Sequence, residues 1–152
     1  MIKNVSFEKT TYNDIPYKFE AGTPNIGDVV ALDKAIQFIE SIGHEAIQDH
    51  ENMLLNYANR KLLDIPGFKP IGVASKKASV LSFIIEGVHQ YDLGQLLDVK
   101  GIAVRTGHHC TQPLMDHLGI DGTVRASFAI YNTTEEIDVF HDALAHIVKR
   151  FN

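Results

Sequence analysis

One short segment concentrates the side chains that could do chemistry. It reads Arg105-Thr106-Gly107-His108-His109-Cys110-Thr111-Gln112-Pro113 and holds two imidazoles, a guanidinium and the only cysteine of the chain. The thiolate is the nucleophilic form of cysteine, and a nearby cation such as Arg105 or a protonated histidine favours it. Because the neighbours of Cys110 are polar, we expect a reactive thiol in a loop between a strand and a short helix.

Two other interpretations of Cys110 remain open at this point. A lone cysteine is often an inert buried side chain. A zinc site made by His108, His109, Cys110 and His117 is also conceivable, because imidazole and thiolate bind zinc well. Adjacent side chains rarely converge on one ion, however, and the sequence has no Cys-x-x-Cys or His-x-x-x-His pair. We therefore expect no metal.

Two further positions could bind an anion. Arg125 interrupts the apolar strand pattern of Val124-Arg125-Ala126-Ser127, and burying a guanidinium is costly unless an anion faces it. That anion could be an Asp or Glu of this chain or the carboxylate of a substrate. The second position is Thr23, just before a predicted helix, where backbone N–H groups and a hydroxyl could bind phosphate. The same residues also commonly form a turn and a helix cap.

Composition limits the class of protein. The chain has 152 residues, 45% of them hydrophobic and 22% charged, with a net charge of −5, which suits one globular core. Basic residues form no run, so we expect no nucleic-acid partner. No stretch approaches the roughly 20 apolar residues that span a bilayer, so we expect no membrane contact and a cytoplasmic location. A single cysteine excludes an internal disulfide.

Hydrophobic periodicity predicts the elements that position these residues. Met1 to Pro24 lacks a helical period and is expected to be an extended arm. The predicted helices cover about Gly27–Ile42, Ile47–Leu62 and Tyr91–Val99, with a last one that follows a capping box of Thr133 and Glu136 and runs to Phe151. The predicted strands are Phe68–Val73, Val80–Glu86, Ile102–Val104 and Thr123–Ile130. The strand pair in the middle favours an antiparallel sheet, hence an α+β fold with helices on one face.

These segments resemble a known family, the Suf-type cysteine desulfurases and selenocysteine lyases of the class V aminotransferase group. The likeness rests on Arg105 to Met115, on Phe19-Glu20-Ala21-Gly22-Thr23-Pro24-Asn25, on Tyr91-Asp92, on Gly101-Ile102-Ala103-Val104, on Val124-Arg125-Ala126-Ser127 and on Tyr131-Asn132-Thr133. The resemblance implies the small C-terminal domain of a fold-type I, pyridoxal-phosphate-dependent transferase. Residues 1–26 would be the arm and lead-in from a larger domain, and residues 27–152 the small domain itself.

The resemblance also implies an activity and roles. L-cysteine would be converted to L-alanine, with the sulfur held as a persulfide on Cys110 and passed to a sulfur-acceptor protein of the Suf system for iron–sulfur cluster assembly. Arg125 matches the residue that holds the substrate carboxylate, and Arg105 matches one that places substrate and thiol. Thr23 matches a threonine that reaches the cofactor phosphate across a homodimer. His108 and His109 would support the loop. L-selenocysteine remains an alternative substrate.

One departure from the family pattern qualifies these expectations. The family holds its cofactor through a lysine in a His-Lys motif, and no lysine of this chain follows a histidine. We therefore expect a C-terminal fragment that binds no pyridoxal phosphate by itself and is inactive alone, since cofactor chemistry needs that electron sink. The alternative is a stand-alone sulfur-relay or interaction module that uses Cys110 and needs no cofactor.

Overall fold

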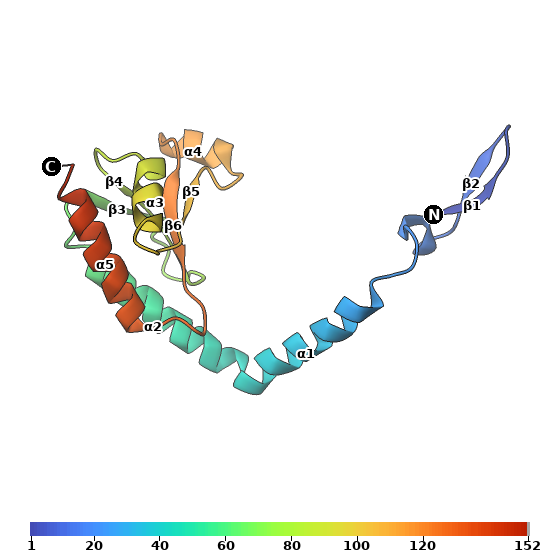
Figure 1. Ribbon diagram of the computed structural model, residues 1–152, viewed down its shortest axis with the longest axis horizontal. Helices are drawn as coiled ribbons and strands as arrows, with labels where there is room; N and C mark the ends of the chain where they lie inside the picture. Colours follow the sequence, from blue (N-terminus) through green and yellow to red (C-terminus); the bar gives the residue numbers. More distant parts are fainter. Residues whose placement is uncertain (152) are drawn as a thin grey trace. The chain divides into compact units, whose positions relative to one another are not determined.

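The computed structural model describes residues 1–151 and divides the chain into two compact units, Met1–Gly43 and His44–Asn152. In the first unit, β1 (Ile2–Val5) and β2 (Thr10–Tyr12) form an antiparallel hairpin, followed by the 3₁₀ turn η1 (Tyr17–Phe19) and helix α1 (Ile26–Ile42) (Figure 1). The segment expected to be an extended arm is therefore a hairpin and a turn. Its strands have no buried face, so alternation could not reveal them.

Helix α1 begins and ends at residues that favour helix ends. The Asn25 side chain accepts the N–H of Asp28 at 3.3 Å, and Gly43 ends the helix with a φ of 92°. None of its residues is buried, although Val29, Val30, Leu32 and Ile36 are apolar. A helix with so much apolar surface is typical of an element that packs within a larger protein.

The second unit is a four-stranded antiparallel sheet with helices. It consists of α2 (His44–Leu62), β3 (Phe68–Ile71), β4 (Val80–Ile85), α3 (Gln90–Asp98), β5 (Arg105–Gly107), α4 (Gln112–Leu118), β6 (Thr123–Ser127) and α5 (Thr134–Val148). The strand order is β3-β4-β6-β5, so β3, which contains Pro70, and β5 form the two edges. Every pair of neighbouring strands is antiparallel. The predicted α+β fold with an antiparallel sheet is confirmed.

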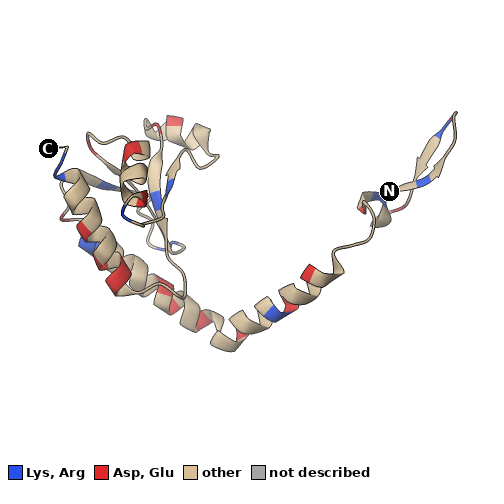
Figure 2. Ribbon diagram, viewed as in Figure 1, with Lys and Arg blue, Asp and Glu red and all other residues tan. Residues whose placement is uncertain are grey.

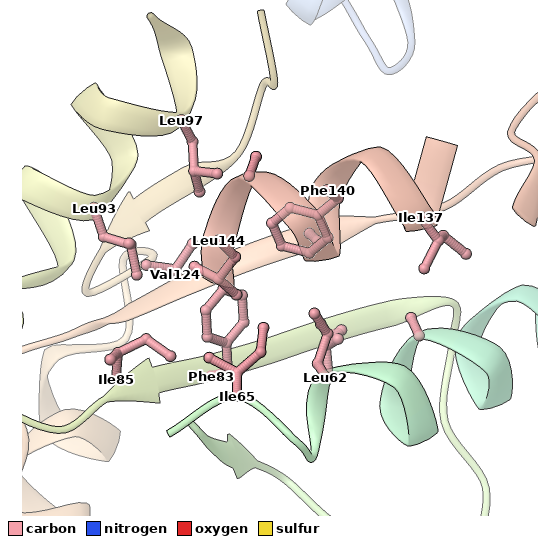
Figure 3. Packing of buried hydrophobic residues seen from close by; sticks show 14 of the residues in the cluster. Leu62, Ile65, Phe83, Ile85, Leu93, Leu97, Val124, Ile137, Phe140 and Leu144 are labelled. Carbon is pink, nitrogen blue, oxygen red and sulfur yellow. The ribbon is translucent and has the colours of Figure 1, made fainter. Parts of the chain in front are cut away.

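The hydrophobic core lies between one face of the sheet and the helices. Leu81, Phe83 and Ile85 alternate along β4 and are buried, as are Val124 and Ala126 of β6. Figure 3 shows these strands meeting side chains of α2, α3 and α5. Thr123 and Arg125 alternate with these residues along β6 and therefore point to the opposite face of the sheet.

Strands β3 and β4 end within two residues of the prediction, whereas β5 and β6 differ from it by three residues. The apolar run Ile102–Val104 precedes β5, because the N–H groups of Lys100, Gly101 and Ile102 bond back to carbonyls at the end of α3. Pairing starts only at Arg105, so the guanidinium belongs to a strand and not to the loop. Strand β6 ends at Ser127, before Ile130, because the chain turns where the Ala129 N–H bonds to the Asn132 side chain at 2.9 Å.

The predicted closing helix is present, and its capping box is confirmed: Thr133 and Glu136 bond reciprocally at the start of α5. The helix ends at Val148, before the predicted end at Phe151, which is exposed in a turn. Polar contacts fasten this helix to α2 and to the turn that follows α2. Asp138 accepts the Tyr57 hydroxyl at 2.7 Å and pairs with Lys61 at 2.8 Å. His141 lies between two carboxylates, with Nε2 2.9 Å from Asp64 and Nδ1 2.9 Å from Asp142.

His141 with its two partners, Asp64 and Asp142, forms what we call the His141 clamp, which makes the free energy of unfolding depend on pH. Partial burial alone would lower the pKa of His141, but the hydrogen bonds to Asp142 and Asp64 outweigh it, and the pKa is raised. A pKa that is higher in the folded state than in the unfolded state stabilises the fold. The full stabilisation is present below the pKa of the unfolded state and is lost as pH rises through the pKa of the folded state. Both carboxylates are more than two-thirds exposed, at 71% and 80%, so we expect a loss of only about 0.5–1 kcal/mol.

Urea unfolding at pH 6 and pH 8 tests this expectation. The variant His141→Gln should lose that part of the pH dependence, while a matched change at the exposed His117 should keep it. Equal pH dependence in wild type and His141→Gln would contradict the role of the clamp.

Candidate functional site

The site is built on the face of the sheet that points away from the hydrophobic core. Arg105 of β5 lies directly opposite Arg125 of β6, and Gly107 lies opposite Thr123. Directly opposed residues point to the same face of a sheet, and so do residues two apart in one strand. Arg105, Arg125 and Thr123 therefore share one face. In Figure 2 both strands carry basic segments, drawn in blue, beside each other.

This register places two positive charges together. Like charges directly opposite on neighbouring strands destabilise a sheet. Arg125 is half-buried, its Nε is buried without a hydrogen-bond partner, and within residues 1–151 no carboxylate pairs with it. The structural salt bridge left open by the sequence is thus not formed in the described chain. An anion bound between the two guanidinium groups would relieve both the repulsion and the unpaired donor.

The loop after β5 presents Cys110 in an unusual conformation. His109 and Cys110 have φ values of 53° and 62°, which non-glycine residues seldom adopt. The Cys110 N–H donates to His108 Nδ1 at 3.1 Å. The Thr111 N–H and hydroxyl both donate to the His108 carbonyl at 2.8 Å. His108 therefore supports the turn locally, and α4 begins directly after it.

The turn brings the thiol to a cation. Cys110 is exposed, and Arg105 Nη2 lies 3.9 Å from its sulfur. An exposed sulfur beside a guanidinium suits a nucleophile that carries negative charge as it reacts. Arg105 thus lies beside the thiol, and Cys110 is not the buried side chain of the first alternative.

His109 points back to the sheet. Its Nε2 lies 2.9 Å from the Thr123 hydroxyl oxygen, while its Nδ1 is buried without a partner. Burial, followed by the nearby Arg125 cation, lowers the pKa of His109, and a hydrogen bond with the backbone of Thr123 opposes this shift only in part. His109 is therefore held as the neutral imidazole at pH 7.

Close packing fixes strand β5 against helix α3. A Cβ at Gly94 would come within 2.5 Å of Thr106 Cγ2. Gly107 has a φ of 107°, and a Cβ there would lie 3.0 Å from the Tyr91 hydroxyl. Both positions need glycine, so the strand that carries Arg105 can approach the helix closely. A cavity of about 500 Å³ is lined by residues such as Ile102, Phe128 and Phe140 and by none of the site residues named above.

The remaining candidates lie elsewhere. Thr23 is exposed in the first unit, two residues before Asn25, which caps α1, and its expected role at a phosphate stays a prediction. His117 lies on α4 and is exposed. Among residues 1–151, no group of three or more His, Cys, Asp or Glu is placed to hold a metal ion. Over the same residues, no helix combines the length and the apolar character needed to cross a membrane.

Sequence reasoning missed Thr123. A threonine in a strand is ordinary, and its partner His109 lies 14 positions away in the sequence. The available signal was weak: a polar residue at the start of an apolar strand, two positions before Arg125.

Comparison with known proteins shows the family to which the chain belongs. The family described as aminotransferase class-V matches residues 1–140. The probable cysteine desulfurase 1 of Mycobacterium leprae is 49% identical over 149 residues, which cover 98% of this chain and 24% of the relative. The apo cysteine desulfurase of Thermococcus onnurineus NA1 has a TM-score of 0.85 and 40% identity over 98% of this chain and 38% of its own.

A second solved structure, the Escherichia coli cysteine desulfurase CsdA described with an S-sulfonic acid, has a TM-score of 0.84 and 36% identity and covers 99% of this chain and 37% of its own. The chain thus spans between about a quarter and somewhat more than a third of the relatives that it matches. The family resemblance inferred from the sequence is confirmed, and this chain belongs to the class-V aminotransferase family.

Proposed function

We propose that this chain is the substrate-binding and sulfur-accepting part of a pyridoxal-phosphate-dependent cysteine desulfurase, which converts L-cysteine to L-alanine and holds the sulfur as a persulfide on Cys110. One observation carries the proposal: Arg125 and Arg105 lie opposite each other on one face of the sheet, and the strand of Arg105 leads to the exposed Cys110. Arg125 is half-buried and has no ion-pair partner within the described chain. This set of groups suits a substrate with a carboxylate and a sulfur.

Each side chain of the site would have a role that suits its chemistry. The guanidinium of Arg125 would bind the substrate carboxylate in its planar fork. Arg105, whose Nη2 lies 3.9 Å from the Cys110 sulfur, would contact the thiolate and orient it toward the substrate. His108 and His109 would support the loop. Thr23 would bind the cofactor phosphate across a homodimer, as the family resemblance implies.

The transfer balances without an added oxidant. The Cys110 thiolate attacks the substrate sulfur, an S–S bond forms, the substrate C–S bond breaks, and the carbon keeps the electron pair and takes up a proton to give alanine. Pyridoxal phosphate, when bound, supplies the electron sink that this bond cleavage needs. The residues of this chain would orient the carboxylate and supply the nucleophile.

The lysine that anchors the cofactor would come from polypeptide of the kind that the relatives carry beyond the matched part. No lysine here follows a histidine, and Lys61 and Lys69 are paired with Asp138 and Glu86. The chain covers 24% of one relative and 38% of a solved one, and α1 has no buried residue. Both observations support a larger working protein.

The exposure of Cys110 supports transfer of the sulfur to another protein. We propose a sulfur-acceptor protein of the Suf system as that partner, with iron–sulfur cluster assembly as the purpose and L-selenocysteine as an alternative substrate. A free, exposed thiol needs a reducing compartment to stay reduced, which favours the cytoplasm.

The isolated chain should not catalyse the reaction. Purified residues 1–152, given pyridoxal phosphate and L-cysteine, should form no alanine or sulfide above a control without protein, because no group here anchors the electron sink. Alanine formation that disappears in Cys110→Ser would contradict this expectation.

The coding sequence upstream of Met1 tests the proposal directly. An open frame with a His-Lys motif should give, when expressed in full, a protein that makes alanine from L-cysteine. Within it Arg125→Lys should raise KM strongly, because a single ammonium cannot bind a carboxylate in two-point geometry. A full-length protein that is inactive toward L-cysteine and L-selenocysteine would refute the proposed function.

The charge beside the sulfur can be measured on the chain itself. At low ionic strength, anionic iodoacetate should alkylate Cys110 faster relative to neutral iodoacetamide than it alkylates a free thiol, because Arg105 attracts the reagent. Arg105→Gln should lower the iodoacetate-to-iodoacetamide rate ratio by about threefold. The exposed Lys100→Gln is the charge-matched control and should leave the ratio near wild type; an equal fall in both variants would argue against a specific contact.

A second candidate function is a sulfur relay, favoured by the exposure of Cys110 and by its independence of any cofactor. Treatment of the chain with a persulfide donor should add the mass of one sulfur, and Cys110→Ser should remove the adduct. The absence of an adduct on the wild-type chain would count against the relay.

A further inference from the structure

The hydroxyl of Thr123 is buried at the base of the site. Thr123 is 1% exposed and lies opposite Gly107, the last residue of β5. A hydroxyl at such depth costs free energy unless it is hydrogen-bonded. Its oxygen lies 2.9 Å from His109 Nε2. This hydrogen bond joins the strand that carries Arg125 to the residue just before Cys110.

The contacts of the two ring nitrogens of His109 determine which one carries the proton. The charged or titratable groups that act on the ring are Arg125 of β6, Arg105 of β5 and His108 of the loop. Nδ1 is buried and unbonded, so an N–H there would be buried without an acceptor, whereas Nε2 lies 2.9 Å from the Thr123 hydroxyl oxygen. Nε2 therefore carries the hydrogen and donates it to the Thr123 oxygen.

The turn at Cys110 needs a tie to the sheet. The bonds to His108 fix the local shape of the turn, but the contact between the Cys110 sulfur and Arg105 requires that the loop stay in place relative to the strand. Two successive residues with positive φ persist only where surrounding contacts hold them. The hydrogen bond from His109 to Thr123 supplies such a contact.

We propose that Thr123 is a positioning residue for the Cys110 site: acting through the neutral His109 ring, its hydroxyl holds the left-handed turn that keeps the Cys110 sulfur beside the Arg105 guanidinium. This role deepens the proposed function and rests on it for its meaning in sulfur transfer. The placement of the sulfur itself is measured without substrate or cofactor, so the two ideas can fail separately.

Paired alkylation rates on the 152-residue chain test the proposal. Thr123→Val keeps the shape of the side chain and removes the hydroxyl, so the iodoacetate-to-iodoacetamide ratio should fall to the value of Arg105→Gln, about threefold below wild type. Thr123→Ser keeps the hydroxyl and should retain the wild-type ratio. A wild-type ratio in a folded Thr123→Val would overturn the proposal, and so would an equal fall in Thr123→Ser.

A second variant covers the case in which Thr123→Val fails to fold. His109→Asn tolerates positive φ but is too short to reach Thr123, so its ratio should also fall about threefold. An unchanged ratio in this variant, with native circular dichroism, would overturn the proposal.

Nitrogen chemical shifts of the ring give a readout that a purely structural role would not move. In the wild type at pH 7, His109 should show a single neutral tautomer with the proton on Nε2. Thr123→Val should show mixed tautomers, and Thr123→Ser should keep the single one. A proton on Nδ1 in the wild type would overturn the assignment of donor and acceptor.

Discussion

The repulsion between Arg105 and Arg125 is the constraint around which the site is organised. The antiparallel register of β5 and β6 makes the two residues direct neighbours, and no carboxylate within residues 1–151 offsets the charge of Arg125. A fold retains such an arrangement at a cost in stability. The arrangement has a physical reason where an anion completes the site, and the proposed substrate, L-cysteine, carries a carboxylate that could do so.

The repulsion between the two arginines is kept away from the hydrophobic core, because the two faces of the sheet carry different residues. The alternation of β4 and β6 directs Leu81, Phe83 and Val124 to the helices and Thr123 and Arg125 away from them. Because the core lies entirely on one face, the chemistry on the other face can carry strain and unpaired donors without disturbing the hydrophobic packing. The glycines at 94 and 107 let α3 support β5 from the side, so Arg105 is held by a rigid strand.

Most of the fold could be predicted from periodicity. Helix α1 ends at Gly43 and α5 begins with its capping box as the sequence indicated, because those signals are local. The start of β5 could not be predicted, because the apolar residues before it close α3 and pack on the core. The hairpin of β1 and β2 escaped prediction because it has no buried face.

The site, like the fold, could be predicted from the sequence only in part. Arg105 and Cys110 could be predicted as candidates because reactive groups clustered in one segment are uncommon, and Arg125 because it interrupts an apolar strand pattern. Two features of the site depend on tertiary structure: the register that opposes the two arginines, and the bond from His109 to Thr123. Neither leaves a periodic or compositional trace, since each joins residues from different elements.

The two edges of the sheet have a consequence for association. Strand β3 carries Pro70, which offers no N–H to a further strand, and Lys69, whose charge would have to be desolvated. Strand β5 has only three residues and runs directly into the Cys110 turn. Growth of the sheet by an added strand from another chain is therefore disfavoured at both ends. The proposed sulfur acceptor would therefore dock at Cys110 through side-chain surfaces and not by adding a strand to the sheet.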